Sequence, residues 1–260
     1  VLERDRKLTP SEFQAFEALL EQRLRRQPVA YILGRKEFWS LPLKVTPAVM
    51  VPRPETEVLV EAVLHRLSLA PVIVELGTGS GAIALALAKE LPQARIYATD
   101  RSPEALAIAR GNACSLGLAQ RIIFLQGDLY EPLPSELAGK IGLLVSNPPY
   151  IPSEELERLE PEVRLYEPRM ALDGGPDGLE IHRRISASAG RFLRPGGLLA
   201  LEIGADQGKA AVQLLEREGF YDAIEVVKDY AGCDRVLLCR FQQSPLPPFC
   251  KGGEGDFAEG

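Results

Sequence analysis

One short run of residues combines side chains suited to chemistry with the place where an α/β enzyme would use them. Residues 141–145 form an apolar stretch typical of a buried strand, and after Ser146 the chain continues as Asn147, Pro148, Pro149 and Tyr150. Proline has no N–H, so carbonyl oxygens in this run can face a ligand without competition from a local donor. Because open α/β sheets bind ligands at the carboxyl ends of their strands, we expect a functional site here rather than a plain loop.

This run is suited to holding a planar amide or exocyclic amino nitrogen. The lone pair of such a nitrogen is delocalised, which makes it a poor nucleophile. We expect the side-chain oxygen of Asn147 and the carbonyl of Pro148 to accept its two hydrogens, with Tyr150 packed against the planar group. Positioning and electrostatics would then direct the lone pair at an electrophilic methyl group. No histidine base is required, and His182 is predicted to be a structural residue at the surface.

A glycine-rich loop forms the second candidate site, between a strand expected at 72–76 and a helix expected at 82–91. Its residues are Gly77, Thr78, Gly79, Ser80 and Gly81. Alternating glycines allow a tight turn and a close approach of the backbone to a ligand. With Ala82 they also satisfy the G-x-G-x-x-G/A template of NAD-binding proteins, and a purely structural turn is a further alternative.

Two acidic residues follow expected strands where an adenosine ligand would lie. Asp100 comes about 20 residues past the glycine loop, where a carboxylate can accept both ribose hydroxyls; a helix cap before Ser102 is the alternative. Asp128 is placed to reach an adenine amino group, and Leu129 could cover the ring face. An ordinary turn is the alternative for this pair.

The elements that must position these residues alternate along the chain. Strands are expected at 72–76, 95–99, 121–125, 141–145 and 198–203, with helices at 82–91, 103–115, 178–193 and 205–218. This alternation is typical of a parallel sheet. Residues 228–234 are too few for a crossover helix, so the strands at 223–227 and 235–240 should pair antiparallel. The prediction is an α/β fold with a doubly wound, seven-stranded, Rossmann-like sheet that ends in an antiparallel hairpin.

Four segments are expected along the chain. Residues 1–28, with a helix at 8–27 capped by Thr9 or Ser11, should be the end of an N-terminal helical domain, because the chain begins at Val1 without methionine. Residues 29–53 should form a hairpin or linker and residues 54–241 the main domain. Residues 242–260, rich in glycine and proline, are expected to be a disordered tail.

Composition limits the classes of partner. With 46% hydrophobic and 25% charged residues the chain can bury a full core, and a formal net charge of −6 gives no global basic footprint for nucleic acid. The four cysteines show no CxxC spacing, so neither zinc nor a disulfide framework is expected. With no long apolar stretch and no signal pattern, a cytoplasmic location is expected and no membrane contact.

Three observations together favour S-adenosylmethionine over NAD as the ligand of the glycine loop. The acidic Glu75 directly precedes the glycines, the sheet should end in an antiparallel hairpin, and the run from Asn147 to Tyr150 follows the fourth strand of the sheet. A dinucleotide fold would instead continue with parallel strands. The sequence therefore predicts methyl transfer to a planar nitrogen.

These residues resemble the HemK/PrmC family of release-factor glutamine methyltransferases, within the class I S-adenosylmethionine-dependent fold. The resemblance covers about residues 29–240 and is carried by the blocks 38–43, 51–57, 75–81, 147–150 and 166–172. The first and last blocks are more specific than the glycine loop, because generic methyltransferases lack them.

The resemblance implies N5-methylation of the glutamine in the Gly-Gly-Gln motif of class I peptide chain release factors. By position, Gly77 to Gly81, Asp100 and Leu129 would bind the donor, and Asn147 to Tyr150 the glutamine, with Asn147 also bordering the donor. Some similar proteins have an aromatic residue at the Leu129 position, and leucine stacks on adenine less well. The family's N-terminal helical bundle would help to grip the release factor.

Two groups of charged residues each allow two interpretations. The block 53–57 would lie near the donor pocket, or Glu55 and Glu57 would only favour a helix N-terminus through its dipole. Arg23, Arg25 and Arg26 are expected to form a solvated helix face, with an acidic patch on the partner as the alternative contact.

Three other functions remain open at this point. They are adenine-N6 methylation of DNA or RNA, for which the same acceptor geometry would serve, glutamine methylation of a ribosomal protein, and a donor-binding scaffold without catalysis. The acidic balance of the chain counts against the first, and the blocks 38–57 and 167–172 against the second.

Overall fold

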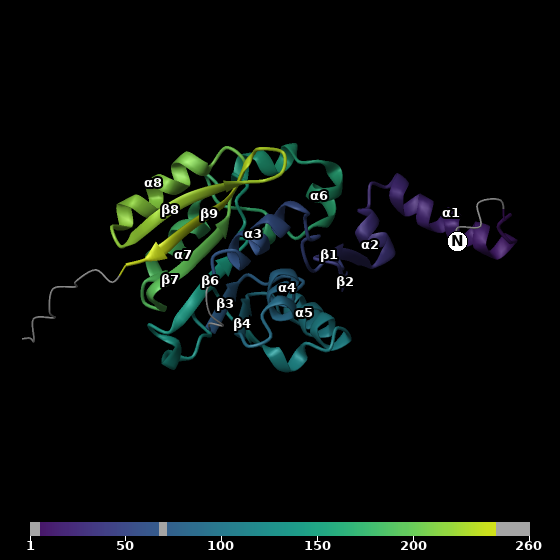
Figure 1. Ribbon diagram of the computed structural model, residues 1–260. Helices are drawn as coiled ribbons and strands as arrows, with labels where there is room; N and C mark the ends of the chain where they lie inside the picture. The colour runs from purple at the N-terminus through teal and green to yellow at the C-terminus, as the bar shows by residue number, and fades with distance from the viewer. Residues whose placement is uncertain (1–5, 68–71, 243–260) are drawn as a thin grey trace, which may run out of the picture.

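The computed structural model describes residues 6–67 and 72–242, which contain a seven-stranded mixed sheet with helices on both faces (Figure 1). Its strands are β3 (Val72–Leu76), β4 (Arg95–Asp100), β5 (Ile122–Gln126), β6 (Ile141–Ser146), β7 (Leu193–Glu202), β8 (Tyr221–Lys228) and β9 (Asp234–Phe241). They lie in the order β5-β4-β3-β6-β7-β9-β8. The chain therefore starts at the centre of the sheet, builds one half outward to β5 and then returns beside β3 to build the other half.

The direction of the strands confirms the predicted topology. β3 pairs parallel with both β4 and β6, and β6 pairs parallel with β7. β9 lies antiparallel between β7 and β8, so the last two strands form a hairpin. The doubly wound α/β sheet ending in an antiparallel hairpin is thus observed, and it differs from a dinucleotide-binding fold in its final strand.

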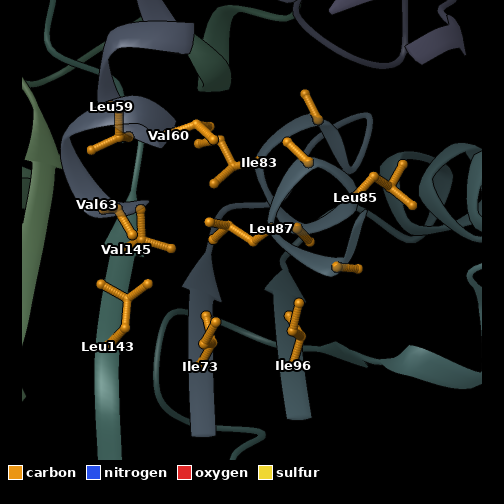
Figure 2. Close-up of a cluster of buried hydrophobic side chains, with 14 of the residues drawn as sticks. Leu59, Val60, Val63, Ile73, Ile83, Leu85, Leu87, Ile96, Leu143 and Val145 are labelled. Carbon is orange, nitrogen blue, oxygen red and sulfur yellow. The ribbon is translucent and has the colours of Figure 1, made fainter. Parts of the chain in front are cut away.

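Alternating side chains on the central strands fill two separate cores. Ile73 and Leu143 point into the core beneath α3 (Glu55–Leu64), α4 (Ala82–Glu90) and α5 (Pro103–Ser115), as Figure 2 shows for the α3 and α4 side. Val74 and Leu144 point into the opposite core, covered by α7 (Glu180–Ala189) and α8 (Gly208–Glu218). Because both faces are covered, the strands are apolar without interruption, as buried parallel strands are.

The N-terminal helix α1 (Pro10–Leu24) projects from the body of the protein (Figure 1). Thr9 caps it in a capping box with Glu12, as expected of a threonine at that place, and no residue of α1 is buried. The side chains of Arg23, Arg25 and Arg26 are 41%, 77% and 49% exposed, as expected of a solvated face. Arg23 and Arg26 also form ion pairs with Glu162 at 2.8 and 2.7 Å, because the end of α1 lies beside α6 (Pro161–Tyr166).

Residues 29–53 contain a short helix, α2 (Val29–Leu33), and a two-stranded hairpin of β1 (Arg35–Phe38) and β2 (Leu41–Lys44). The hairpin alternative is therefore the observed one. Its turn places Trp39 and Ser40 at positive φ, which is unusual for residues other than glycine. Glu57 holds the turn by accepting a hydrogen bond from the Trp39 backbone N–H at 2.7 Å, a contact more specific than a helix-dipole effect.

Two element boundaries differ from the sequence-based expectation. The helix expected at 178–193 spans only Glu180–Ala189, and the following strand begins at Leu193 rather than at Leu198. The register between β6 and β7 shifts after Leu193, so the Pro-Gly-Gly segment bulges out before pairing resumes. Four short 3-10 helices complete the structure, at Ala119–Arg121, Ser135–Leu137, Ser153–Arg158 and Arg169–Ala171.

The expected disordered tail lies, apart from Gln242, outside the described residues, and the division into four segments stays a prediction. In the part of the chain that the structure describes, no helix is both long and apolar enough to cross a membrane.

Candidate active site

A pocket lies at the carboxyl ends of β3, β4 and β6. The pocket lies at the switch point of the sheet, where the strands that follow β3 change from one side of it (β4, β5) to the other (β6, β7). Open α/β sheets bind ligands at such switch points. Ten of the twelve site residues predicted from the sequence line this pocket, and Gly81 and Tyr150 do not. The ten are Gly77, Thr78, Gly79, Ser80, Asp100, Asp128, Leu129, Asn147, Pro148 and Pro149. Glu75 lines it as well. Thr56 from the predicted block 53–57 also lines it.

The glycine loop uses its glycines in two different ways. Gly77 and Gly79 have φ of 72° and 56°, and a Cβ built on either would meet nothing within 4 Å, so this backbone is open to a ligand. Gly81, with φ of 85°, lies behind the pocket; a Cβ there would come within 3.2 Å of Ala109 on α5. The carbonyl of Thr99 fixes the start of the loop by accepting hydrogen bonds from the N–H groups of Gly77 and Thr78.

Glu75 is 1% exposed at the end of β3, beneath the glycine loop. Its Oε2 accepts hydrogen bonds from the Thr78 hydroxyl at 2.5 Å and from the Ala84 N–H at 3.1 Å, so it joins the loop to the first turn of α4. Burial raises the pKa of Glu75 to about 8 even though both hydrogen bonds oppose this change. Near neutral pH the carboxyl group is therefore largely protonated.

Asp100 ends β4 and faces the same loop. Its two oxygens accept hydrogen bonds from the N–H groups of Gly79, at 2.8 Å, and Ser102, at 2.9 Å. Ser102 is itself the N-cap of α5, so the alternative in which Asp100 caps this helix is not what the structure has. Asp100 braces the glycine loop and lines the pocket, and burial raises its pKa.

Asp128 and Leu129 form the far wall of the pocket. The Asp128 carboxylate is paired with Arg184 at 2.6 Å and lies 4.0 Å from Arg101, contacts that the sequence did not predict. Leu129 has φ of 49°, and its carbonyl accepts a hydrogen bond from the Thr99 hydroxyl at 3.0 Å. Leu129 lines the pocket, and its side chain also packs against the core covered by α7 and α8.

The run after β6 enters the pocket from the opposite side. Ser146 anchors it, because its hydroxyl donates to the Leu76 carbonyl at 2.7 Å. The Asn147 Nδ2 donates to the Thr56 hydroxyl at 3.1 Å. No described residue donates a hydrogen bond to the Oδ1 of Asn147 or to the carbonyl oxygen of Pro148. Both residues line the pocket, so each brings an acceptor that no described residue uses.

Tyr150, like Gly81, is a predicted site residue that does not line the pocket. It is half-buried and does not line the pocket, and its hydroxyl donates to Oε1 of Glu202 at 3.3 Å. Its carbonyl accepts a hydrogen bond from the Gln207 side chain at 2.9 Å. Packing of the Tyr150 ring against an acceptor therefore stays a prediction.

Several supporting residues were missed by the sequence reading. A Cβ on Gly174 would lie 2.8 Å from the Pro149 carbonyl, and one on Gly178 would overlap the Tyr150 carbonyl. The loop 173–178 therefore packs directly against the run from Asn147 to Tyr150. Its three glycines within five positions were a signal of close backbone approach.

The prediction of His182 as a surface residue is wrong. Its side chain is fully buried, and Nε2 lies 2.8 Å from the carbonyl oxygen of Glu202. His182, Ile185 and Ala189 share the face of α7 that packs on the sheet, because they recur at helical spacing. Burial lowers the pKa of His182 to about 4, so the ring is neutral and structural.

Comparison with known proteins supports the fold. A family model described as a methyltransferase small domain matches residues 54–159, and one described as the PrmC N-terminal domain matches residues 1–34. A solved methyltransferase from Pyrococcus furiosus is 19% identical, with a TM-score of 0.59 over 88% of this chain and 98% of that one. The sheet order, the glycine loop and the matched domain define a class I S-adenosylmethionine-dependent methyltransferase.

Curated relatives narrow this class to one family. The release factor glutamine methyltransferase of Moorella thermoacetica is 51% identical over 90% of this chain and 82% of its own length. That of Geobacter sulfurreducens is 45% identical over 90% of this chain and 80% of its own. The chain belongs to the release factor glutamine methyltransferase family.

Proposed function

We propose that this protein methylates the side-chain amide nitrogen of the glutamine in the Gly-Gly-Gln motif of a class I peptide chain release factor. One observation carries the proposal: Asn147 and Pro148, each with an acceptor that no described residue uses, line the same pocket as the glycine loop. A primary amide has two N–H hydrogens, and these acceptors match them. Membership of the family supports glutamine as the side chain that carries this amide.

The residues that line the pocket are suited to S-adenosylmethionine, the methyl donor. Gly77 and Gly79 leave open space beside their backbone, and Asp100 and Leu129 line the same pocket, where they suit the ribose and the base of a nucleoside derivative. The residues that would hold the donor are Gly77, Thr78, Gly79, Ser80, Gly81, Asp100, Asp128, Leu129 and Asn147, with Gly81 acting through helix packing. S-adenosylmethionine supplies a methyl group on a positively charged sulfur.

The protein's part in the reaction is positioning. Asn147 Oδ1 and the Pro148 carbonyl each accept one amide hydrogen, which fixes the plane of the acceptor and turns the face of its nitrogen toward the donor site. The same acceptors stabilise positive charge that develops on the nitrogen during transfer. No histidine lines the described pocket, and none is required, because a methylated amide nitrogen is acidic enough to lose its proton to water or to a carbonyl oxygen.

The expected partner is a protein rather than nucleic acid. A net charge of −6 gives no basic surface overall for a phosphate backbone, which disfavours the adenine-N6 alternative. A translation factor as substrate also agrees with the expected cytoplasmic location.

A substrate panel tests the proposal. The full chain is incubated with methyl-labelled S-adenosylmethionine and a release factor, the same factor with the motif glutamine replaced by alanine, a ribosomal protein, or duplex DNA. Label on the intact release factor alone is expected. Label on DNA or on the ribosomal protein, with none on the release factor, would refute the assignment.

A further inference from the structure

The middle of the run from Asn147 to Tyr150 has no hydrogen-bond donor with which to hold itself. Pro148 and Pro149 have no N–H, so this part of the backbone offers only acceptors. Proline fixes φ but leaves ψ free, so the direction of the Pro148 carbonyl depends on where the chain is held on either side of it. Contacts at the two ends of the run therefore determine where this acceptor points.

The two ends of the run are held by different elements. At the first end, the Ser146 hydroxyl on β6 donates to the Leu76 carbonyl at 2.7 Å. At the second end, the Tyr150 carbonyl accepts a hydrogen bond from Nε2 of Gln207 at 2.9 Å. Gln207 lies 57 positions further along the chain, at the N-cap of α8, and is only 8% exposed. A buried side chain from outside the pocket thus holds the far end of the run.

The Gln207 amide is fixed in a single orientation. Its Oε1 accepts a hydrogen bond from the Gly204 N–H at 2.8 Å, and its own backbone N–H donates to the Gly204 carbonyl at 3.0 Å. A backbone N–H only donates and a backbone carbonyl only accepts, so Oε1 must face Gly204 and Nε2 must face Tyr150. The turn that starts α8 therefore presents one fixed donor to the end of the run.

The loop 173–178 closes over this hydrogen bond. A Cβ on Gly178 would overlap the Tyr150 carbonyl and would lie 2.5 Å from Nε2 of Gln207. Directly after Tyr150, Ile151 pairs with this loop in a parallel β-bridge. The contact between Tyr150 and Gln207 is thus covered by backbone, and no side chain fits at position 178.

We propose that Gln207 is a positioning residue for methyl transfer, which holds the end of the run so that the Pro148 carbonyl keeps its direction toward the amide nitrogen of the substrate. The inference rests on the proposed function, because it assigns how that function's acceptor site is kept in place. Gln207 does not line the pocket, so it acts through Tyr150 and not by touching the substrate or the donor. Since a displacement of about 1 Å at a reacting group can cost about 100-fold in rate, loss of this hydrogen bond should slow the transfer.

The first test replaces Gln207 with residues of similar length that cannot donate to Tyr150. An ionised carboxylate in Gln207→Glu can still accept from Gly204 but sets an acceptor against the Tyr150 carbonyl, and Gln207→Met removes both hydrogen bonds without adding charge. In both variants we expect kcat to fall about 10- to 100-fold while the Kd for S-adenosylhomocysteine changes less than about twofold. Gln213→Glu, which adds the same charge at an exposed position of α8, is the matched control and should keep the wild-type rate.

Two results of this test would overturn the proposal. One is a wild-type kcat in Gln207→Met, which would show that the hydrogen bond to Tyr150 has no part in the reaction. The other is a loss of S-adenosylhomocysteine binding as large as the loss of rate, because Gln207 would then support the whole fold rather than the acceptor site.

A double-mutant cycle tests whether Gln207 acts through the Tyr150 carbonyl. Gly178→Ala displaces the same carbonyl, so adding it to Gln207→Met should lower kcat by no more than about twofold beyond the larger single loss. Losses that multiply in the double variant would show that the two residues act independently and would contradict the proposal.

A third measurement needs no substrate and separates this inference from the proposed function. The side-chain ¹⁵N–H signals of Asn147, assigned by their loss in Asn147→Ala, should shift in Gln207→Met, because the end of the run is then free, and stay unchanged in Gln213→Glu. If no release factor is methylated but these signals behave as expected, the proposed function fails and the role of Gln207 in holding the run stands. Asn147 signals that do not respond to Gln207→Met would refute that role whatever the substrate is.

Discussion

Nη2 of Arg53 donates a hydrogen bond to Oε1 of Glu167 at 2.6 Å, joining two segments that lie 114 positions apart. The Glu167 side chain is 1% exposed, whereas a third of the Arg53 side chain reaches solvent. Arg53 precedes the α3 turn that carries Thr56, and Glu167 precedes Met170, and both Thr56 and Met170 line the pocket. This ion pair therefore holds two walls of the active site together.

Replacing Arg53 with alanine should destabilise the protein by about 2 to 3 kcal/mol, because it leaves a buried carboxylate without its partner. Arg53→Lys is the matched control, since it keeps the charge and should recover part of the loss. Urea unfolding followed by circular dichroism measures both. A change in Arg53→Ala below about 0.5 kcal/mol would show that the pair does not brace the site.

Gly178→Ala should lower methyl transfer through the backbone it displaces. A Cβ at this position, with φ of 73°, would overlap the Tyr150 carbonyl and approach the Gln207 side chain that holds it. We expect kcat to fall about 10-fold or more. Gly196→Ala is the matched control, because it has φ of 72° and nothing within 4 Å, so it shares only the backbone strain. Similar rates in the two variants would contradict the packing argument.

The stability of the donor-free protein should decrease as pH rises. Glu75 has its ordinary pKa of 4.5 in the unfolded chain and a pKa of about 8 in the folded protein, so its contribution to stability is complete at low pH and is lost as pH rises through 8. Glu202 acts in the same direction at about 7. In Glu75→Gln the decrease between about pH 5 and about pH 9 should be smaller, whereas Glu155→Gln, an exposed control, should follow the wild type. Unfolding midpoints across this range measure the effect, and parallel curves for wild type and Glu75→Gln would refute it.

Leu129→Phe should bind S-adenosylhomocysteine more tightly. Leu129 lines the pocket where the adenine is proposed to lie, and an aromatic ring stacks on a base more favourably than leucine does. We expect the Kd to decrease about 3- to 10-fold, as isothermal titration calorimetry can measure. The same substitution at Leu165, which is exposed on α6, serves as the control. A higher Kd in Leu129→Phe than in the wild type would show that the adenine does not lie against this side chain.

Local patterns were enough to predict the architecture. Each central strand is a short apolar run that ends in a polar or glycine-rich segment, and the connection at 228–234 is too short for a helix, so the parallel sheet and its final hairpin follow from the sequence. The five-residue helix α2 was missed because so short an element carries no periodic signal.

Partners distant in sequence were not predictable in the same way. Asp128 was expected to be free for a ligand, but Arg184 meets it from 56 positions away. Likewise, nothing local to Thr56 shows that its hydroxyl accepts a hydrogen bond from Asn147, 91 positions away. The sequence did indicate that Glu202 is unusual, because a charged residue in the apolar run 198–203 needs hydrogen-bonding partners once it is buried.

Mass spectrometry of a release factor after incubation with the enzyme and deuteromethyl S-adenosylmethionine tests the central claim most directly. The account predicts a deuterated methyl group on the side-chain nitrogen of the Gly-Gly-Gln glutamine. It also predicts none with Asn147→Ala, although that variant should bind S-adenosylhomocysteine within about twofold of the wild type. A methyl group on any other residue, or undiminished transfer by Asn147→Ala, would contradict the claim that Asn147 and Pro148 present this nitrogen to the donor.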